Sequence, residues 1–223
     1  MDHACKLTSG TASLDTIGHL PDPKAVHYTL LLFAYFLGSI SCSVLICKLA
    51  GLPDPRHTGS NNPGATNVLR IGGKRLAVLA LFGDILKGII PVVVARLLTT
   101  DHLILSLVGL FAFVGHLYPV FFRFQGGKGV ATAGGVYIAL AWPVALALVG
   151  VWIAAALITR YSSVASLSAA TVAPALIYVF LPDISYTLAC CAIAALIYWR
   201  HRPNIARLRD GTESRIRLAS PRN

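Results

Sequence analysis

The sequence predicts an all-α integral membrane protein with about seven transmembrane helices and Gly-rich loops on the cytoplasmic side. Three observations support this fold class. Of the 223 residues, 56% are hydrophobic and only 13% are charged, the mean hydropathy is +0.69, and apolar runs make up most of the chain. Because a helix needs about 20 predominantly apolar residues to cross the hydrocarbon core, several crossings are required. This composition excludes an ordinary soluble domain.

Seven apolar segments are the candidate spans, and they cover approximately residues 28–50, 76–98, 102–122, 129–141, 143–160, 164–181 and 184–199. The fourth and fifth are the least distinct. Trp142-Pro143 between them fits either a tight turn or a kink inside one long hairpin. Counts of six or eight crossings therefore remain alternatives.

The spans divide the chain into three parts. Residues 1–27 are expected to form a polar N-terminal tail, residues 28–199 a transmembrane domain, and residues 200–223 a basic cytoplasmic tail that contributes to the functional site. The N-terminal segment lacks the apolar region of a secretory signal, so we expect it to be retained. The five cysteines do not have metal-ligand spacing, and we expect no metal and no cofactor.

The distribution of basic residues predicts the orientation in the membrane. With seven crossings, most of the 19 Lys and Arg residues fall on one side; the exceptions are Lys6, Lys24 and Arg96 on the other side and Lys87 inside the second span. The positive-inside rule then places the N-terminus outside and the C-terminus in the cytoplasm of a bacterial inner membrane. The net charge of +10 is spread over loops, which favours lipid headgroups or phosphate-bearing substrates over nucleic acid.

The first loop rich in small polar residues covers residues 54–70 and includes Gly59, Ser60, Asn62, Asn67 and Arg70. Small residues let backbone N–H groups approach an anion, and an arginine can bind phosphate oxygens through two parallel hydrogen bonds. A flexible turn is the simpler alternative, because Asn-Pro-Gly is common in turns. We favour a phosphate-binding loop, since a plain turn does not need this length.

The second motif is Gly126-Gly127-Lys128-Gly129, which precedes the expected fourth span. Glycines at a helix start expose N–H groups to an anion, and the lysine adds a full charge. The spacing differs from a Walker A loop, so it does not indicate ATP hydrolysis. Alternatively, Lys128 is only a charge anchor at the membrane edge. His116, near the end of the third span, is either a packed imidazole or a ligand to substrate.

The third motif follows the last span and contains His201, Asn204 and Glu213 among several arginines. A basic tail often binds lipid headgroups, and this explanation has about equal weight with a substrate site. Asp84 and Lys87 lie within the second span on one helical face. We expect them to form a structural ion pair, with support of the first loop as the functional alternative.

Taken together, these motifs resemble the bacterial acyl-phosphate:glycerol-3-phosphate acyltransferase family. The resemblance covers nearly all of the chain beyond residue 28. It is carried by Gly38-Ser39-Ile40, the segment from Gly59 to Arg70, Asp84 with Lys87-Gly88, Gly115-His116 with Pro119-Val120-Phe121, residues 126–132 and residues 200–213. Two positions depart from the family pattern: Asn61 replaces a common glycine, and Ser41 replaces a common proline. Asparagine tolerates left-handed backbone angles, and Ser41 is expected to soften a kink in the first helix.

The resemblance implies seven helices around a cytoplasmic site, where an acyl group passes from acyl phosphate to the 1-hydroxyl of glycerol-3-phosphate. The products would be lysophosphatidic acid and inorganic phosphate, within phospholipid biosynthesis. It implies acyl phosphate, glycerol-3-phosphate and membrane lipid as partners, no nucleic acid, and a functional link to the enzyme that makes acyl phosphate. It assigns Ser60, Arg70, Lys128, His201 and Asn204 to substrate phosphates as the catalytic set. It gives Gly59, Asn62, Asn67, His116, Gly126, Gly127, Gly129 and Glu213 to substrate binding.

The expected mechanism uses no catalytic dyad. Acyl phosphate is already activated, so the protein needs mainly to hold two anions together and stabilise the departing phosphate. We expect Lys128 and Arg70 to do this, while a substrate phosphate oxygen or His201 accepts the hydroxyl proton. The sequence also lacks a Gly-x-Ser-x-Gly elbow. An organic-phosphate or anion transporter is the alternative function; the grouping of polar motifs at one face instead of the midplane argues against it.

Overall fold

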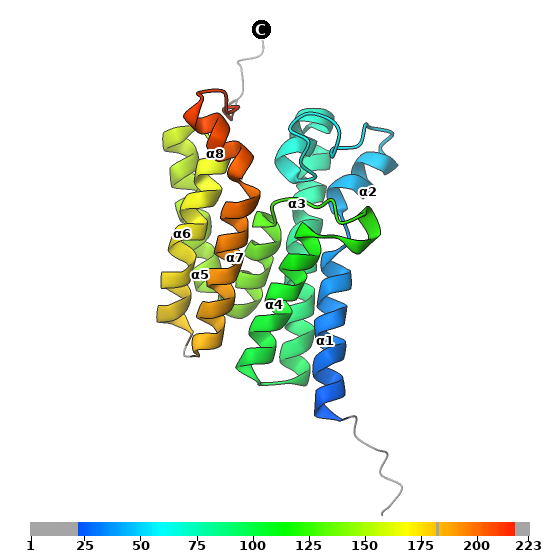
Figure 1. The fold of residues 1–223 in the computed structure, drawn as a ribbon, viewed down its shortest axis with the longest axis vertical. Helices are drawn as coiled ribbons and strands as arrows, with labels where there is room; N and C mark the ends of the chain where they lie inside the picture. The colour runs from blue at the N-terminus through cyan, green and yellow to red at the C-terminus, as the bar shows by residue number, and fades with distance from the viewer. Residues whose placement is uncertain (1–21, 182, 217–223) are drawn as a thin grey trace, which may run out of the picture.

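The computed structural model describes residues 22–181 and 183–216, and all regular elements in these ranges are helical (Figure 1). In chain order they are α1 (Pro23–Gly38), α2 (Cys42–Leu49), α3 (Ala65–Leu98), α4 (His102–Leu117), the short 3-10 helix η1 (Val120–Phe122), α5 (Val130–Thr159), α6 (Ser162–Phe180), α7 (Ile184–Arg200) and α8 (Arg202–Arg209). The helix α1 starts earlier than the expected residue 28. Residues 1–21 of the expected N-terminal tail and residues 217–223 of the C-terminal tail lie outside the described ranges.

Within the described residues, four helical segments are long and apolar enough to cross a membrane: α3, α4 continued to Phe122, α5 and α6. The pair α1 and α2 would make a fifth if the two helices form one bent span, and α7 is a shorter apolar helix. These lengths do not establish the expected count of seven crossings, which stays a prediction.

The first expected span, 28–50, is broken into α1 and α2, which meet at an angle of 41°. Ser41 at the break is extended, with φ −85° and ψ 92°, so the serine has not removed the kink. Tertiary contacts hold the break in place. Gly38 packs so closely on the Ala112 carbonyl of α4 that a side chain there would collide with it, and the Lys87 ammonium donates to the freed Ile40 carbonyl at 2.8 Å.

The helix α5 reverses direction near Ala141, whose backbone is non-helical with φ −155° and ψ 86°. Residues before and after α5 both join the same polar network, because Lys128 contacts Asn204 and Ser163 contacts Glu213, which Asn204 also binds. The middle of α5 lies at the opposite end, where Arg96 of α3 donates to the Ala139 carbonyl at 2.6 Å.

The two arms of α5 therefore correspond to the expected fourth and fifth segments, with the turn at the predicted Trp142-Pro143 position. They pack on different neighbours. A side chain at Gly135 in the first arm would collide with the Ile85 carbonyl of α3. In the second arm, the Trp152 indole N–H donates to Ser166 of α6 at 3.2 Å. The hairpin thus connects the α1–α4 half of the bundle to the α6–α7 half.

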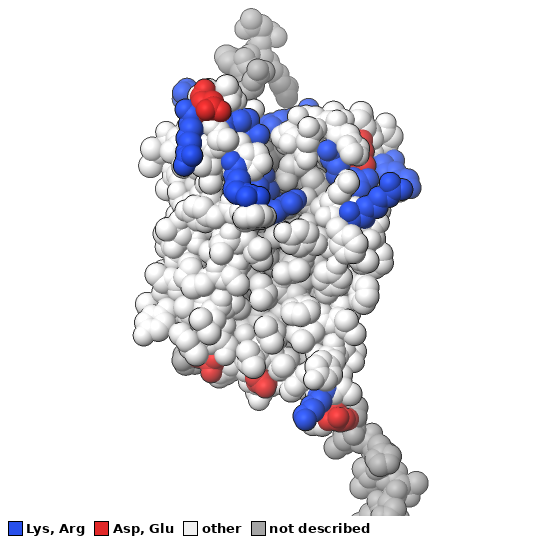
Figure 2. Space-filling view, viewed as in Figure 1, with Lys and Arg blue, Asp and Glu red and all other residues white. Residues whose placement is uncertain are grey.

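Basic residues gather at one end of the molecule, the end that carries α8 and the long loops, whereas acidic residues predominate at the other end (Figure 2). The second end contains the caps of the helices: Asp22 caps α1, Asp101 caps α4 and Asp183 caps α7. This asymmetry agrees with the charge distribution read from the sequence. The direction of the basic end, toward the cytoplasm, stays a prediction from the positive-inside rule.

Candidate active site

In the structure the first loop runs from residue 52 to residue 64, and the rest of the predicted loop, up to Arg70, forms the start of α3. The loop is held in shape by Asn67 in the first turn of α3. The Asn67 side-chain oxygen accepts the Ser60 backbone N–H at 2.9 Å, and its amide nitrogen donates to the Pro55 and Thr58 carbonyls at 2.9 and 2.8 Å. Asn67 is 1% exposed and all its amide groups are used within the loop. Among the predicted residues it therefore shapes the site through the loop backbone.

Left-handed backbone angles explain two small residues in this loop. Gly59 has φ +68°, and a side chain there would collide with the Asn67 amide. Asn61 has φ +54°; it occupies the position where the family pattern has glycine, and asparagine is among the residues that reach this region most readily. The expectation that Asn61 is a mild departure is thus consistent with the loop geometry, and Ser60 between the two is exposed.

The second loop lies between α4 and α5. Gly127 packs closely on the His116 imidazole, and the Arg200 guanidinium at the end of α7 donates to the Gly127 and Gly126 carbonyls at 3.0 and 2.5 Å. Gly126 and Gly127 are buried, so they position the loop while the following Lys128 extends toward the third segment. Sequence reasoning missed this role of Arg200, because the partners lie far apart in the chain.

The third segment, residues 200–213 at the end of α7, in α8 and just after it, forms a polar network around Glu213. The carboxylate accepts from Asn204 at 2.6 Å, Ser163 at 2.8 Å and Arg207 at 2.8 Å. The Asn204 oxygen in turn accepts from the Lys128 ammonium at 2.5 Å. Burial alone would raise the pKa of Glu213, but the hydrogen bonds from Asn204, Ser163 and Arg207 bring it below its ordinary value. The network therefore holds Lys128 and Asn204 beside one ionised carboxylate.

His201 joins α7 to α8 and is 2% exposed. Its Nδ1 lies 2.8 Å from the Ile197 carbonyl, and because a carbonyl only accepts, Nδ1 carries the hydrogen and Nε2 keeps a free lone pair. Burial and then the nearby charge of Lys128 lower the pKa of His201 to about 4. The ring is accordingly neutral at pH 7.

Lys128 also has a lowered pKa, about 8. Burial is the main cause; Glu213 opposes the shift, and the positive charges of Arg207 and Arg70 add to it. The ammonium is still mostly protonated at pH 7, and more positive than negative groups surround it, with Glu213 opposed by Arg207, Arg70 and Arg200. An anionic ligand would relieve this imbalance.

Polar groups from all three loops line one cavity of about 870 Å³. The predicted residues in its lining are Gly59, Ser60, Asn62, Asn67, Arg70, His116, Lys128, Gly129, His201, Asn204 and Glu213. Gly126 and Gly127 are not in this lining and act behind it. Arg207 lines the cavity as well, although sequence reasoning did not select it from among the arginines of the tail.

The same cavity continues between α3, α5 and α6, where its lining is apolar. The lining there includes Leu81, Ile138, Trp142, Leu146, Val149 and Trp152. A second cavity of about 500 Å³ adjoins the polar end; it shares Ser60, Lys128, Asn204 and Arg207 with the first and adds Arg200 and Arg202. The arrangement suits an amphipathic ligand with an anionic group at the basic end and a hydrocarbon chain along the helices.

A buried ion pair lies beneath the polar end. Asp84 and Lys87 are 2.9 Å apart, as expected for a structural pair, and the Asp84 carboxylate lies 3.7 Å from His116 Nδ1. His116 also contacts the Thr132 hydroxyl at 3.1 Å. The imidazole therefore packs against Gly127 and also lines the cavity, and its role as a ligand to substrate stays a prediction.

Residues 28–211 match the family model for glycerol-3-phosphate acyltransferases. The chain belongs to this family of enzymes. The acyltransferase from Methylococcus capsulatus is 48% identical over 191 residues, which cover 86% of this chain and 96% of the relative. The acyltransferase from Thioalkalivibrio sulfidiphilus is 51% identical over 187 residues, covering 84% and 92%. The resemblance inferred from the motifs is thus confirmed, and membership of an enzyme family favours catalysis over the transporter alternative.

The acyltransferase fold also matches solved structures. Crystal structures of PlsY (YgiH), an integral membrane glycerol 3-phosphate acyltransferase, cover 85% of this chain and 95% of their own. The glycerol 3-phosphate form matches with a TM-score of 0.82 at 45% identity, and the lysophosphatidic acid form with 0.80 at 44%. The predicted fold class, an all-α integral membrane protein, is confirmed.

Proposed function

We propose that this acyltransferase moves an acyl group from acyl phosphate to the 1-hydroxyl of glycerol-3-phosphate, giving lysophosphatidic acid and inorganic phosphate. One observation carries the proposal: a single cavity joins a basic polar end, lined by Arg70, Lys128 and Arg207, to an apolar lining between α3, α5 and α6. The donor and the product of this reaction both have a phosphate and a fatty chain. The polar and apolar parts of the cavity complement these two parts of one molecule.

Two anionic reactants must meet at the polar end. The second cavity supplies the additional space, because it shares Ser60, Lys128 and Asn204 with the first. In this arrangement one phosphate lies on either side of the shared residues. The relative in its glycerol 3-phosphate form and its lysophosphatidic acid form supports the same acceptor and product for this chain.

Each predicted catalytic residue has a physical role in the proposal. Arg70, exposed at the cavity, binds phosphate oxygens through its planar guanidinium. Ser60 and Asn204 supply uncharged hydrogen bonds, and the Lys128 ammonium neutralises negative charge on the departing phosphate. These groups stabilise charge where it develops, which is the main requirement for an already activated acyl donor.

The proposed step forms one bond and breaks one. The 1-hydroxyl oxygen of glycerol-3-phosphate attacks the acyl carbonyl carbon, and the bond between that carbon and the bridging phosphate oxygen breaks. The phosphate leaves with the electron pair, and the hydroxyl proton ends on it as hydrogenphosphate. No water enters the reaction.

The proton acceptor we favour is a phosphate oxygen. His201 has a free Nε2 lone pair, but its pKa of about 4 makes it a weak base at pH 7. A phosphate monoester with a second pKa of about 6 binds a proton more strongly, and the ideal base has a pKa near the working pH. His201 then accepts a hydrogen bond from a substrate hydroxyl at Nε2 in its neutral form or relays the proton briefly.

The proposal places the basic end in the cytoplasm, within a bacterial inner membrane, where the enzyme that makes acyl phosphate can deliver the donor. It keeps the domain organisation expected from the sequence, with the segment from residue 200 onward contributing His201, Asn204 and Glu213 to the transmembrane domain. The polar network around Glu213 supports this part of the proposal.

The test is direct. Purified protein is incubated with labelled glycerol-3-phosphate and, in parallel, with palmitoyl phosphate, palmitoyl-CoA or palmitoyl-acyl carrier protein. Labelled lysophosphatidic acid should form only with acyl phosphate, together with an equal amount of inorganic phosphate. Turnover with a thioester at a similar rate would refute the proposed donor. The Lys128→Ala variant, which we expect to be about tenfold to hundredfold slower, serves as the control.

A further inference from the structure

The first and second loops both contribute to the site, but they are tied to the rest of the protein differently. The second loop is joined to the third segment near the cavity by Arg200 and by the contact between Lys128 and Asn204. The first loop is ordered internally by Asn67. The position of Ser60 relative to Lys128 therefore depends on how the first loop contacts the second.

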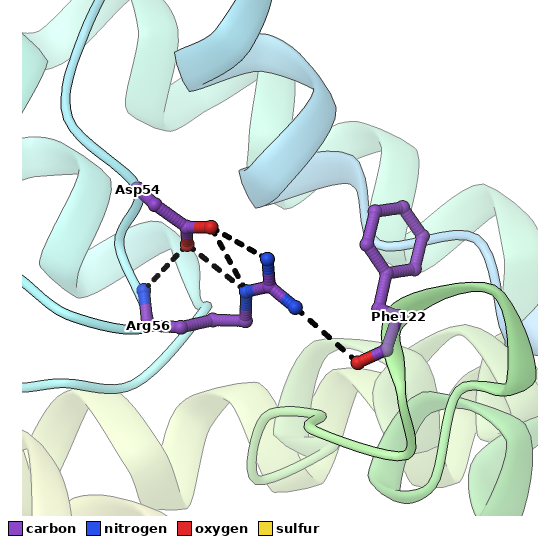
Figure 3. Close-up of polar contacts among 3 residues, drawn as sticks. All are labelled: Asp54, Arg56 and Phe122. Atoms are coloured by element: carbon purple, nitrogen blue, oxygen red, sulfur yellow. Dashed lines mark hydrogen bonds and ion pairs between the residues drawn. The ribbon is translucent and has the colours of Figure 1, made fainter.

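Arg56 makes that contact, as Figure 3 shows. Its Nη1 donates to the Phe122 carbonyl of the second loop at 3.2 Å. The other edge of the planar guanidinium binds Asp54: Nε lies 3.0 Å from both carboxylate oxygens and Nη2 lies 2.6 Å from one of them. The Asp54 carboxylate also accepts the Arg56 backbone N–H at 2.9 Å, so one carboxylate binds both the backbone and the side chain of Arg56.

Arg56 does not act as a substrate ligand in this geometry. Neither Arg56 nor Asp54 is in the lining of the two cavities, and Nε, Nη1 and Nη2 of the Arg56 guanidinium each already donate to a protein acceptor. A second contact lies closer to the cavity, where the Gly127 backbone packs against the Pro63 carbonyl. The two contacts lie at different points along the same pair of loops, and together they would hold the first loop against rotation.

We propose that Asp54, Arg56 and the Phe122 carbonyl form a latch, and that Arg56 is a positioning residue that keeps the first loop in its substrate-binding position before substrate arrives. The inference rests on the proposed function in one respect, namely that Ser60 and Arg70 bind the same reactants as Lys128. Without the latch the first loop samples other positions, and the substrate has to select the competent one. The apparent affinity for glycerol-3-phosphate then falls in proportion to the fraction of molecules whose first loop is in the substrate-binding position, while the rate of reaction in the bound complex is unchanged.

The decisive experiment is steady-state kinetics of Arg56→Lys, measured with whichever acyl donor supports turnover. Lysine keeps the charge but cannot bridge a carboxylate and a carbonyl as a planar fork does. We expect the KM for glycerol-3-phosphate to rise roughly threefold to tenfold, the range for losing a partly exposed charge-assisted contact, with kcat within about twofold of wild type. Arg75→Lys is the matched control, since Arg75 is exposed and lines neither cavity; it should leave KM unchanged.

Asp54→Asn provides a second variant, because it keeps an oxygen for the Arg56 backbone N–H and removes the charge. The latch predicts that Asp54→Asn and Arg56→Lys are not additive in KM, since either change releases the same contact. Hydrogen exchange of substrate-free protein should rise in residues 52–64 and 118–125 and stay constant in residues 200–213. Equal exchange in wild type and Arg56→Lys would overturn the latch.

The KM and kcat values separate positioning from simple destabilisation. A variant that only misfolds has less active enzyme, and so a lower apparent kcat with an unchanged KM; this result, or a KM equal to that of wild type, overturns the proposal. Failure of acyl phosphate as donor would affect the proposed function alone, because KM for glycerol-3-phosphate is then measured with the donor that works.

Discussion

Removal of the Lys128 ammonium should be the most damaging single change at the site. Its Nζ donates to the Asn204 oxygen at 2.5 Å, and in the proposed reaction it also contacts the departing phosphate. Loss of a charge-assisted contact costs about 1.5–3 kcal/mol, which corresponds to roughly a tenfold to hundredfold lower rate. Lys128→Ala should therefore reduce kcat/KM by this factor at pH 7.

The pH dependence gives an independent measure of the same group. Because the pKa of Lys128 is lowered to about 8, the ammonium is charged at pH 7 and neutral well above pH 8. Wild-type activity should fall as pH rises through about 8. Lys128→Arg keeps its charge throughout this range, since the pKa of arginine exceeds about 12. Its activity should therefore not fall as pH rises through about 8, even if its maximal rate is lower than that of wild type.

The assay is formation of labelled lysophosphatidic acid by purified variants in one detergent, with thermal unfolding measured on each sample. Lys74→Ala is the control, since Lys74 is an exposed lysine that lines neither cavity. Normal turnover of Lys128→Ala, or an activity of Lys128→Arg that still falls as pH rises through about 8, would refute the role assigned to Lys128.

Four further outcomes are expected. Arg70→Lys should lower kcat/KM by about tenfold or more, because a point charge does not reproduce a bidentate fork; activity near wild type would contradict phosphate binding by Arg70. Because the pKa of Glu213 is lower in the folded protein than its ordinary value of 4.5, the ionised carboxylate stabilises the fold fully above pH 4.5, and this stabilisation is lost as pH falls through the folded-state pKa. The unfolding temperature of Glu213→Gln should therefore depend less on pH in this window than that of wild type. Gly135→Leu should destabilise the packing of α5 on α3, by about 1–3 kcal/mol for overpacking, and an unfolding temperature equal to that of wild type would argue against the close contact with Ile85. Reporter fusions at the C-terminus should be active only on the cytoplasmic side, and an extracellular readout would reverse the orientation.

Local patterns accounted for most of the secondary structure. The apolar runs that predicted the spans correspond to α3, α4, α6, α7 and the two arms of α5, because a helix in lipid must be apolar along its length. The left-handed angle at Asn61 was also accessible to sequence reasoning, since few residue types reach that region. The break between α1 and α2 was anticipated only through the family resemblance, as a kink softened by Ser41. The contacts with Ala112 and Lys87 of other helices, which hold the break in place, were not anticipated.

The candidate site divides in the same way. Its basic and amide residues could be selected from three Gly-rich segments, because phosphate binding requires charge and small residues at short spacing. The partners of those residues could not be selected. Arg200 behind Gly126, Ser163 and Arg207 on Glu213, and the latch at Arg56 connect positions that are distant in sequence or unremarkable in composition.

The sequence by itself thus determined that this chain is a helical membrane protein with three motifs at one end whose residue types favour phosphate binding, since hydropathy and residue chemistry are local properties. Only the tertiary structure decided that the motifs converge on one cavity, that this cavity continues into an apolar channel, and that the pKa of Lys128 falls to about 8. Those outcomes depend on which helices pack together and on how much water they exclude, and neither is a property of any single segment.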